Sequence, residues 1–142
     1  MSLPAADDVA AYRYWMHEHV RFADLDLIGH VNNTVYATYV ESGRAAFLKE
    51  IGLWVMGSGI QNVVARLEID YKRELHYQQQ LRIGVRVLDI GRRSYRIGCG
   101  IFSGEVCHAS GVAVVVRWDA KTRASIALDE AALAKLRPHL AV

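Results

Sequence analysis

The sequence RFADLDLIGHVNNTVY, which occupies residues 21–36, determines how the rest of the chain is arranged. It brings two carboxylates, Asp24 and Asp26, to the end of an expected strand. A turn at Gly29 follows, and residues 32–34 (Asn-Asn-Thr) are types that favour the N-cap of a helix. The segment therefore predicts a strand end, a short turn and a helix start in direct succession.

The residues downstream predict one long helix from this start to Ile51. Apolar residues recur at three- and four-residue steps, as the 3.6-residue turn of an amphipathic helix requires. Gly52 follows in the position of a C-cap glycine. Gly43 lies on the apolar face, where its missing side chain allows another backbone to approach closely. The apolar positions are Val35, Tyr36, Tyr39, Val40, Gly43, Ala46, Phe47 and Ile51.

Four later segments alternate apolar and polar residues with a period of two, which predicts strands at 63–71, 81–87, 95–101 and 112–118. In the first of them, the period places Val63, Ala65 and Leu67 on one face. Turn residues at 90–93 and 103–104 join strands tightly, and tight turns give antiparallel pairing.

Two further elements complete the expected fold. A first strand is predicted at residues 12–22, and a short final helix at 128–137 that ends at Pro138. The result is an α+β fold in which an antiparallel five-stranded sheet wraps around one long central helix. All 142 residues are expected to form a single domain, with 1–11 as a flexible N-terminus.

The composition excludes several classes of protein. Hydrophobic residues make up 52% of the chain, which excludes a disordered protein, and the net charge of +2 is too small to indicate nucleic-acid binding. No apolar run approaches the roughly 20 residues of a membrane helix, and the acidic N-terminus is unlike a secretory signal. Cys99 and Cys107 have no metal-site spacing, so we expect buried free thiols, a cytoplasmic protein and no metal.

A carboxylate close to a helix N-terminus has a specific chemical use. The first N–H groups of a helix lack acceptors and carry partial positive charge, so they stabilise an oxygen that becomes negative. A carboxylate six or seven residues upstream, across the glycine turn, can reach the same place. The pair of features suits hydrolysis of an activated acyl group; the alternative is that both aspartates only form turns and caps.

The motif resembles the opening of hotdog-fold acyl-CoA thioesterases of the 4-hydroxybenzoyl-CoA thioesterase type. The resemblance is carried by Asp24-Leu25-Asp26-Leu27-Ile28-Gly29-His30-Val31-Asn32-Asn33, followed by Tyr36, Tyr39, Glu41 and Arg44. Weaker similarity continues through 63–71, 92–94 and 111–113. A departure from the family is Tyr77-Gln78-Gln79-Gln80, where relatives often have a Gly-Asp turn.

The resemblance implies a catalytic site. Asp26 is expected to act as general base or nucleophile, with Asp24 supporting the turn, and the backbone N–H of Asn33 is the expected oxyanion donor. His30 joins them in orienting the thioester or water. Asn32 and Tyr36 are expected to line the substrate pocket. Glu41 is the alternative catalytic carboxylate, and no cofactor is expected beyond the coenzyme A of the substrate.

A basic hairpin is the second expected substrate contact. Eight basic and four acidic residues occur between residues 66 and 96, a local balance of 8 − 4 = +4. Arg92, Arg93 and Ser94 stand at a turn, where they are placed to bind the phosphates of coenzyme A; the alternative is a solvated strand face. Trp54 and Met56 are expected either to line a pocket or to pack at the helix end.

Three functions and one assembly follow from the sequence. The first function is hydrolysis of an acyl-CoA thioester. The alternatives are a thioesterase for acyl carrier protein and a non-catalytic acyl-CoA-binding protein. A sheet of this kind leaves an unpaired edge strand, so the expected partners are the acyl-CoA substrate and further copies of the chain, in a homodimer or homotetramer, with no nucleic acid and no membrane.

Overall fold

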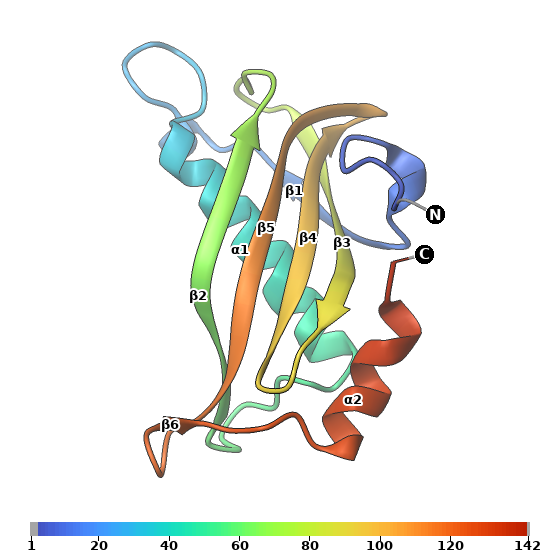
Figure 1. Ribbon diagram of the computed structural model, residues 1–142. Helices are drawn as coiled ribbons and strands as arrows, with labels where there is room; N and C mark the ends of the chain where they lie inside the picture. Colours follow the sequence, from blue (N-terminus) through green and yellow to red (C-terminus); the bar gives the residue numbers. More distant parts are fainter. Residues whose placement is uncertain (1–2, 142) are drawn as a thin grey trace.

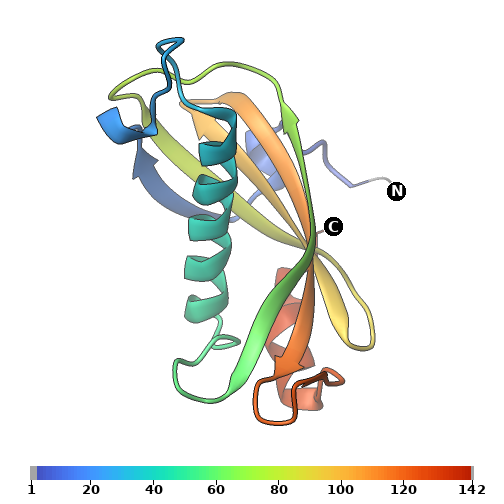
Figure 2. The ribbon, with the colours of Figure 1, turned by 90° about the vertical axis from the view of Figure 1, so that its left-hand side faces the viewer.

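The computed structural model describes residues 3–141 and shows an α+β fold in which one curved antiparallel sheet packs against helix α1 (Asn33–Glu50) (Figures 1 and 2). The main path of the sheet runs in the order β1-β3-β4-β5-β2, and β6 pairs with the end of β5. The strands are β1 (Tyr14–His19), β2 (Ile60–Tyr71), β3 (Gln80–Ile90), β4 (Ser94–Ser103), β5 (Val106–Asp119) and β6 (Ala124–Ser125).

Most of the expected elements are present, with three differences in extent. The sheet has six strands within residues 3–141 rather than five, because the two-residue β6 is too short to give a periodic pattern. The first strand ends at His19, and the one-turn helix η2 (Phe22–Asp24) occupies the end of the expected range. β5 begins six residues earlier than predicted, in a segment that includes Cys107 and His108.

Helix α1 has the ends that the sequence predicts. The side chain of Asn32 is the N-cap, and its Oδ1 accepts a hydrogen bond from the Thr34 N–H at 2.9 Å. Ile51 is the C-cap, and Gly52 follows with a φ of +80°, a conformation that glycine adopts without a steric penalty. The prediction of both ends is confirmed.

Gly43 brings α1 close to the sheet. A Cβ atom added at this glycine would lie 2.5 Å from Cγ2 of Ile83, a residue of β3. The close approach that the sequence predicts therefore occurs within the chain, between α1 and β3, and Gly43 is not needed to explain contact with a second subunit. The small size of Gly43 therefore fixes the spacing between the middle of α1 and the sheet.

β2 is one of the two edge strands of the main sheet path, and a bulge changes which of its residues face the core side. Val64 pairs with the buried Val115, while Leu67 pairs with the buried Ala113. Directly paired residues point to the same face, so Val64 and Leu67 share the core side although they are three residues apart. The predicted grouping of Val63 with Leu67 is wrong because the extra residue at the bulge shifts the alternation.

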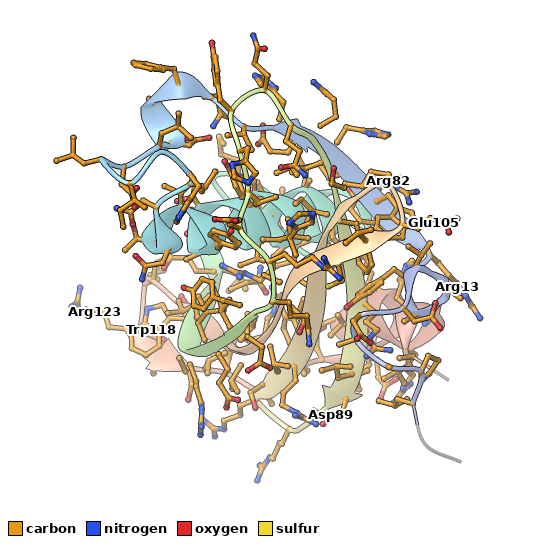
Figure 3. All side chains as sticks on the ribbon, turned by 90° about the horizontal axis from the view of Figure 1, so that it is seen from above. Arg13, Arg82, Asp89, Glu105, Trp118 and Arg123 are labelled. Atoms are coloured by element: carbon orange, nitrogen blue, oxygen red, sulfur yellow. The ribbon has the colours of Figure 1, made fainter. Side chains whose placement is uncertain are left out.

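Residues on the other side of the sheet form a smaller apolar cluster. Tyr12, Phe102 and Cys107 pack together there, and the hydroxyl of Tyr12 donates a hydrogen bond to the Ala6 carbonyl at 2.7 Å. Residues 3–11 include the short helix η1 (Val9–Ala11), and Met1 and Ser2 lie outside the described residues, so the expected flexibility of this terminus stays a prediction. Charged side chains such as Asp89, Glu105 and Arg123 project at the periphery (Figure 3).

Two local features remain, the turn before β3 and the final helix. The turn before β3 uses Gln78 in the left-handed conformation, with φ of +66°, where relatives often use glycine. The expected final helix is α2 (Glu130–Leu136), capped by Asp129 and followed by the 3₁₀ turn η3 (Arg137–His139), which contains Pro138. α2 contributes Ala132 and Leu136 to the main core.

Candidate active site

A tight loop between residues 25 and 31 positions Asp26. Leu25 and Val31 form a β-bridge, and inside it the N–H of Asp26 donates to the His30 carbonyl at 3.1 Å. Gly29 has a φ of +100° and donates to the carbonyl of Asp26 at 3.1 Å. This loop is the light-blue loop that projects beyond the start of α1 in Figure 1.

The Asp26 carboxylate is held on one side and free on the other. Its Oδ1 accepts a hydrogen bond from the Ile28 N–H at 2.9 Å, which is the Asx turn typical of such loops. Its second oxygen accepts no hydrogen bond from residues 3–141. Asp26 is half-buried, so one carboxylate oxygen has a fixed direction and the other is available to a ligand.

Asp24 has a different environment, although it lies only two residues away. It is 9% exposed, and its Oδ2 accepts hydrogen bonds from the Arg21 N–H at 3.0 Å and from the Tyr39 hydroxyl at 2.6 Å. Burial raises the pKa of Tyr39, and the hydrogen bond to Asp24 raises it further. Asp24 therefore anchors the loop to α1, while Asp26 faces a cavity.

The start of α1 presents an unpaired backbone donor. The side chain of Asn32 accepts hydrogen bonds from both the N–H and the hydroxyl of Thr34. The N–H of Asn33 has no acceptor within residues 3–141. A free N–H at the positive end of an 18-residue helix is suited to bind an oxygen that carries negative charge.

One cavity of about 420 Å3 brings four of the predicted residues together. Asp26, His30, Asn33 and Tyr36 all line it. Nε2 of His30 lies 3.4 Å from a carboxylate oxygen of Glu74, which also borders the cavity. Asn32 is not among the lining residues, because its side chain caps the helix; its predicted contact with substrate stays a prediction.

The far wall of this cavity includes Tyr71, Lys72 and Arg73, for which the sequence predicts no catalytic or binding role. The Tyr36 hydroxyl donates to the carbonyl of Arg73 at 3.0 Å, and the Tyr36 ring packs edge-on against Tyr71 at 5.1 Å between ring centroids. The Tyr71 hydroxyl donates to the Asn33 carbonyl at 3.0 Å. Lys72 borders the cavity beside them.

The order of the elements could have predicted that residues 71–74 lie at this site. α1 is followed by a loop and then by the long strand β2, so the end of β2 returns to the beginning of α1 (Figure 2). Residues 71–74 must then lie near residues 32–36. Their mixture of one tyrosine, two cations and one carboxylate marks them as a polar wall rather than core.

The basic hairpin lies at the opposite end of the sheet from the Asp26 cavity. Ser94 pairs with Val116, which also pairs with Val63, whereas Tyr71 at the cavity is eight residues farther along β2. At about 3.3 Å per residue the separation is roughly 26 Å. Arg93 donates hydrogen bonds to the carbonyl and hydroxyl oxygens of Ser125 at 3.0 and 3.1 Å.

The hairpin therefore does not join the other predicted residues within one chain. Arg92 and Arg93 are exposed, and the carbonyl of Arg92 accepts a hydrogen bond from the Leu128 N–H. Ser94 is half-buried at the start of β4. Whether these three residues bind coenzyme A stays a prediction, which for this geometry requires a site shared with another subunit.

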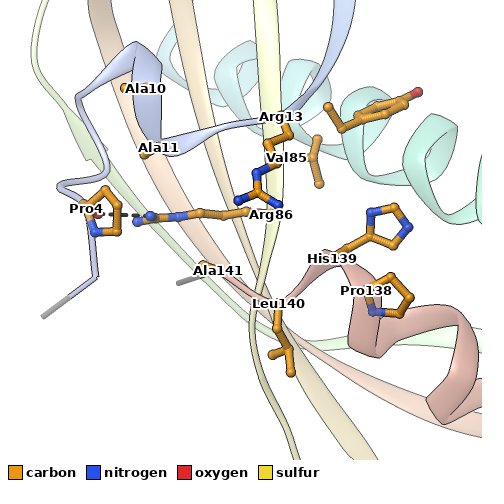
Figure 4. A pocket seen from close by; sticks show the side chains of 11 residues that line it. Pro4, Ala10, Ala11, Arg13, Val85, Arg86, Pro138, His139, Leu140 and Ala141 are labelled. Carbon is orange, nitrogen blue, oxygen red and sulfur yellow. Dashed lines mark hydrogen bonds between the residues drawn. The ribbon is translucent and has the colours of Figure 1, made fainter. Parts of the chain in front are cut away.

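Two further cavities lie away from Asp26. One, of about 430 Å3, lies between α1 and β2 and is lined by Glu41 and Trp54. The alternative carboxylate Glu41 therefore does not share the Asp26 cavity. Met56 is exposed and does not line the α1–β2 cavity. The other, of about 70 Å3, lies near both chain ends, where Arg86 donates to the Pro4 carbonyl at 2.9 Å (Figure 4).

The remaining expectations concern metal sites, thiols and membrane spans. Within residues 3–141 no group of three or more His, Cys, Asp or Glu side chains is arranged to hold a metal ion. Cys99 and Cys107 are free and buried, and burial raises the pKa of the Cys99 thiol to about 12. None of the helices in this part of the chain has the length and apolar character needed to cross a membrane.

The fold and the motif together define a class of protein, and comparison with known families identifies it. Residues 20–136 match the family model of the Thioesterase-like superfamily. The chain belongs to this family, which confirms the resemblance seen in residues 24–33.

Three relatives extend the match over most of the chain. The uncharacterized protein YsmA of Bacillus subtilis strain 168 is 28% identical over 81% of this chain and 84% of its own length. A predicted thioesterase from Bacillus stearothermophilus has a TM-score of 0.83 at 26% identity, covering 89% of this chain and 96% of the other. A thioesterase from Thermus thermophilus, solved with coenzyme A and Zn, has a TM-score of 0.80 at 30% identity, covering 90% and 95%.

Proposed function

We propose that the protein hydrolyses an acyl thioester of coenzyme A to the free acid and coenzyme A. The observation that carries the proposal is the shared cavity: the carboxylate of Asp26 and the unpaired N–H of Asn33 line the same 420 Å3 space in a member of the Thioesterase-like superfamily. The coenzyme A in the Thermus thermophilus relative supports this choice of thioester.

The two groups have complementary tasks in hydrolysis. Asp26 accepts a proton from water as the water oxygen attacks the thioester carbonyl carbon. The carbonyl oxygen becomes an oxyanion, and the Asn33 N–H, at the positive end of α1, stabilises it. The C–S bond then breaks, the carbonyl re-forms as a carboxylic acid, and the thiolate of coenzyme A takes up the proton that Asp26 accepted.

An alternative first step uses Asp26 as nucleophile. Its free oxygen attacks the same carbonyl carbon, the thiolate leaves, and water hydrolyses the mixed anhydride that results. The Asx turn that holds Oδ1 supports either role because it fixes the direction of the carboxylate. His30, bordered by Glu74, is placed to orient the water or the thioester, and Tyr36 to form the cavity wall.

The basic residues nearest to the cavity are the stronger candidates for the phosphates of coenzyme A. Lys72 and Arg73 are exposed at its rim and also border a neighbouring hollow. A cationic side chain at the mouth of a cavity attracts a polyanionic substrate. Arg92 and Arg93 act on a phosphate in this scheme only when a partner subunit brings its hairpin to the site.

The exposed edge strand supports assembly with further copies of the chain, in a homodimer or homotetramer. β2 pairs only with β5 within residues 3–141, and Val63, Val64 and Leu67 on it are 41%, 37% and 38% exposed. An unpaired, apolar edge strand favours pairing with a second copy.

Two further assignments belong to this proposal. The curved sheet around α1 is the hotdog arrangement, with α1 as its central helix. The compartment is the cytoplasm, because its reducing conditions keep the two free thiols of Cys99 and Cys107 reduced.

The test is a panel of short, medium, long and aromatic acyl-CoA thioesters, with release of free thiol measured for the purified protein. Hydrolysis that Asp26→Asn abolishes supports the proposal. The acyl-carrier-protein alternative predicts turnover only when the same acyl groups are carried on that protein. Tight binding of acyl-CoA without thiol release indicates the non-catalytic alternative and contradicts the proposal.

A further inference from the structure

The cavity between α1 and β2 contains a charge that the chain does not balance. Arg44 lies in its wall with only 7% of its surface exposed. The Nη1 atom of this guanidinium has no hydrogen-bond partner within residues 3–141. Because buried cations in proteins are normally paired, this atom indicates a negatively charged group from outside the chain.

A second guanidinium, that of Arg117, contacts Asn62, which also lines the cavity. Nη1 of Arg117 donates to the Leu53 carbonyl at 3.0 Å and to Oδ1 of Asn62 at 3.2 Å, both of which are neutral acceptors. The hydroxyl of Tyr95 donates to the same amide oxygen at 2.8 Å. Burial raises the pKa of Tyr95, and the positive charges of Arg117 and Arg44 oppose that rise, which is consistent with both cations lying near its hydroxyl.

No carboxylate in the described part of the chain lies within 4.0 Å of either guanidinium. Glu41, one turn before Arg44 on α1, also lines the cavity, but it is exposed to solvent. The rest of the wall is largely apolar and includes Leu48 and Trp54. The cavity thus combines largely apolar walls with one buried cation that has no anionic partner.

An apolar row connects this cavity with the candidate active site. Val64, Leu67 and Ile69 pair with residues 115, 113 and 111 on the core side of β5, so they line the same face of β2 between the two cavities. Asn33 and Arg44 are eleven residues apart on α1, about 16 Å along the helix axis. An acyl chain whose carbonyl lies at Asn33 reaches the arginine by following this row.

We infer that the far end of the acyl group occupies the α1–β2 cavity and that this end is a carboxylate. The substrate class is then a thioester of a dicarboxylic acid, with one carboxyl group joined to coenzyme A and the other bound by Arg44. The inference rests on the proposed function for the reacting end. A guanidinium forms strong, paired hydrogen bonds with a carboxylate, whereas a methyl end would leave the cation unpaired.

The experiment compares two substrates of equal chain length, tetradecanedioyl-CoA and tetradecanoyl-CoA, whose chains are long enough to cover the roughly 16 Å between Asn33 and Arg44. We expect kcat/KM of the wild type to be at least about tenfold higher for tetradecanedioyl-CoA, the lower end for a hydrogen bond to a charged group. Arg44→Met removes the charge, and the ratio of the two kcat/KM values should fall towards one. Arg66→Met is the matched control: Arg66 is exposed on β2 and pairs with Glu68, and the ratio should persist.

A second variant keeps the test independent of any folding defect in Arg44→Met. Asn62→Asp keeps the oxygen that accepts from Arg117 and adds a negative charge to the wall of the cavity. We expect this variant to lose the preference for tetradecanedioyl-CoA, because the added carboxylate repels the second carboxylate of the substrate. Equal kcat/KM values for the two thioesters in the wild type overturn the inference.

Binding of free tetradecanedioate separates this inference from the proposed function. Isothermal titration should show tetradecanedioate binding to the wild type, with tetradecanoate binding more weakly and Arg44→Met binding neither selectively. If neither thioester is hydrolysed, the proposed function fails, and Arg44-dependent tetradecanedioate binding still supports the ligand class of the cavity. Absence of both tetradecanedioate binding and substrate preference means that an apolar chain or a partner subunit's carboxylate fills the cavity, and the inference is wrong.

Discussion

The two cavities beside α1 hold different charged groups. At the start of α1, a carboxylate and an unpaired N–H surround a cavity that suits a reacting carbonyl group. Three turns farther along, a second cavity of similar volume holds a buried cation without an anion. On the proposals above, the first cavity stabilises charge that develops in a reaction, and the second binds charge that a ligand carries.

The sharpest test of the first cavity is Asp26→Asn. The substitution keeps the shape of the side chain and the Asx turn but removes the base or nucleophile. We expect kcat to fall by at least about 100-fold, the lower end for general acid–base catalysis. Steady-state thiol release measures it, and an unchanged Tm shows that the loop still folds.

Asp24→Asn is the matched control for that test, and its main effect should be on stability. Asp24 accepts hydrogen bonds from Arg21 and Tyr39 in a buried position, and the amide replaces a charged acceptor with a neutral one. We expect a loss of about 1–3 kcal/mol in the free energy of unfolding, measured by denaturant titration, and a smaller loss of kcat than for Asp26→Asn. If Asp24→Asn is the variant that abolishes activity, the assignment of the two aspartates is reversed.

The sequence predicts the first cavity much better than the second. The loop, the N-cap and the free N–H arise from neighbours within residues 24–34, where spacing and residue type act directly. From the sequence, Arg44 is only one residue of a motif, because its lack of a partner depends on where Asn62, Tyr95 and Arg117 meet in three dimensions.

The same contrast holds for the fold. Period-two alternation predicts the main strands, but no local pattern predicts the bulge near Ala65, which places Val64 on the core side of the sheet. The two-residue β6 and the early start of β5 are missed for another reason. Each pairs with its neighbour in sequence across a tight turn, Ala124 with Asp119 and Val106 with Ser103, but neither segment shows a clear alternation of apolar and polar residues.

The basic residues give a smaller effect and compare the rim of the cavity with the distant hairpin. Lys72→Ala combined with Arg73→Ala should raise KM for an acyl-CoA several-fold and leave kcat largely intact, because a phosphate contact is uniform between ground and transition states. The rise should shrink at high salt, since exposed charges are screened. Initial-rate kinetics at two salt concentrations measure it, and an unchanged KM excludes this rim as the phosphate site.

The smallest effect is expected from Arg92→Ala combined with Arg93→Ala. Both side chains are exposed and roughly 26 Å from the Asp26 cavity of their own chain. Only a subunit arrangement that brings the hairpin to a neighbouring site lets them meet the phosphates of coenzyme A. In that case KM rises modestly with kcat unchanged, and the rise disappears when light scattering shows that dilution has dissociated the oligomer. Equal KM for mutant and wild type at every concentration identifies the hairpin as a solvated turn. The Lys72 and Arg73 rim then remains the only one of the two basic regions that contacts the substrate.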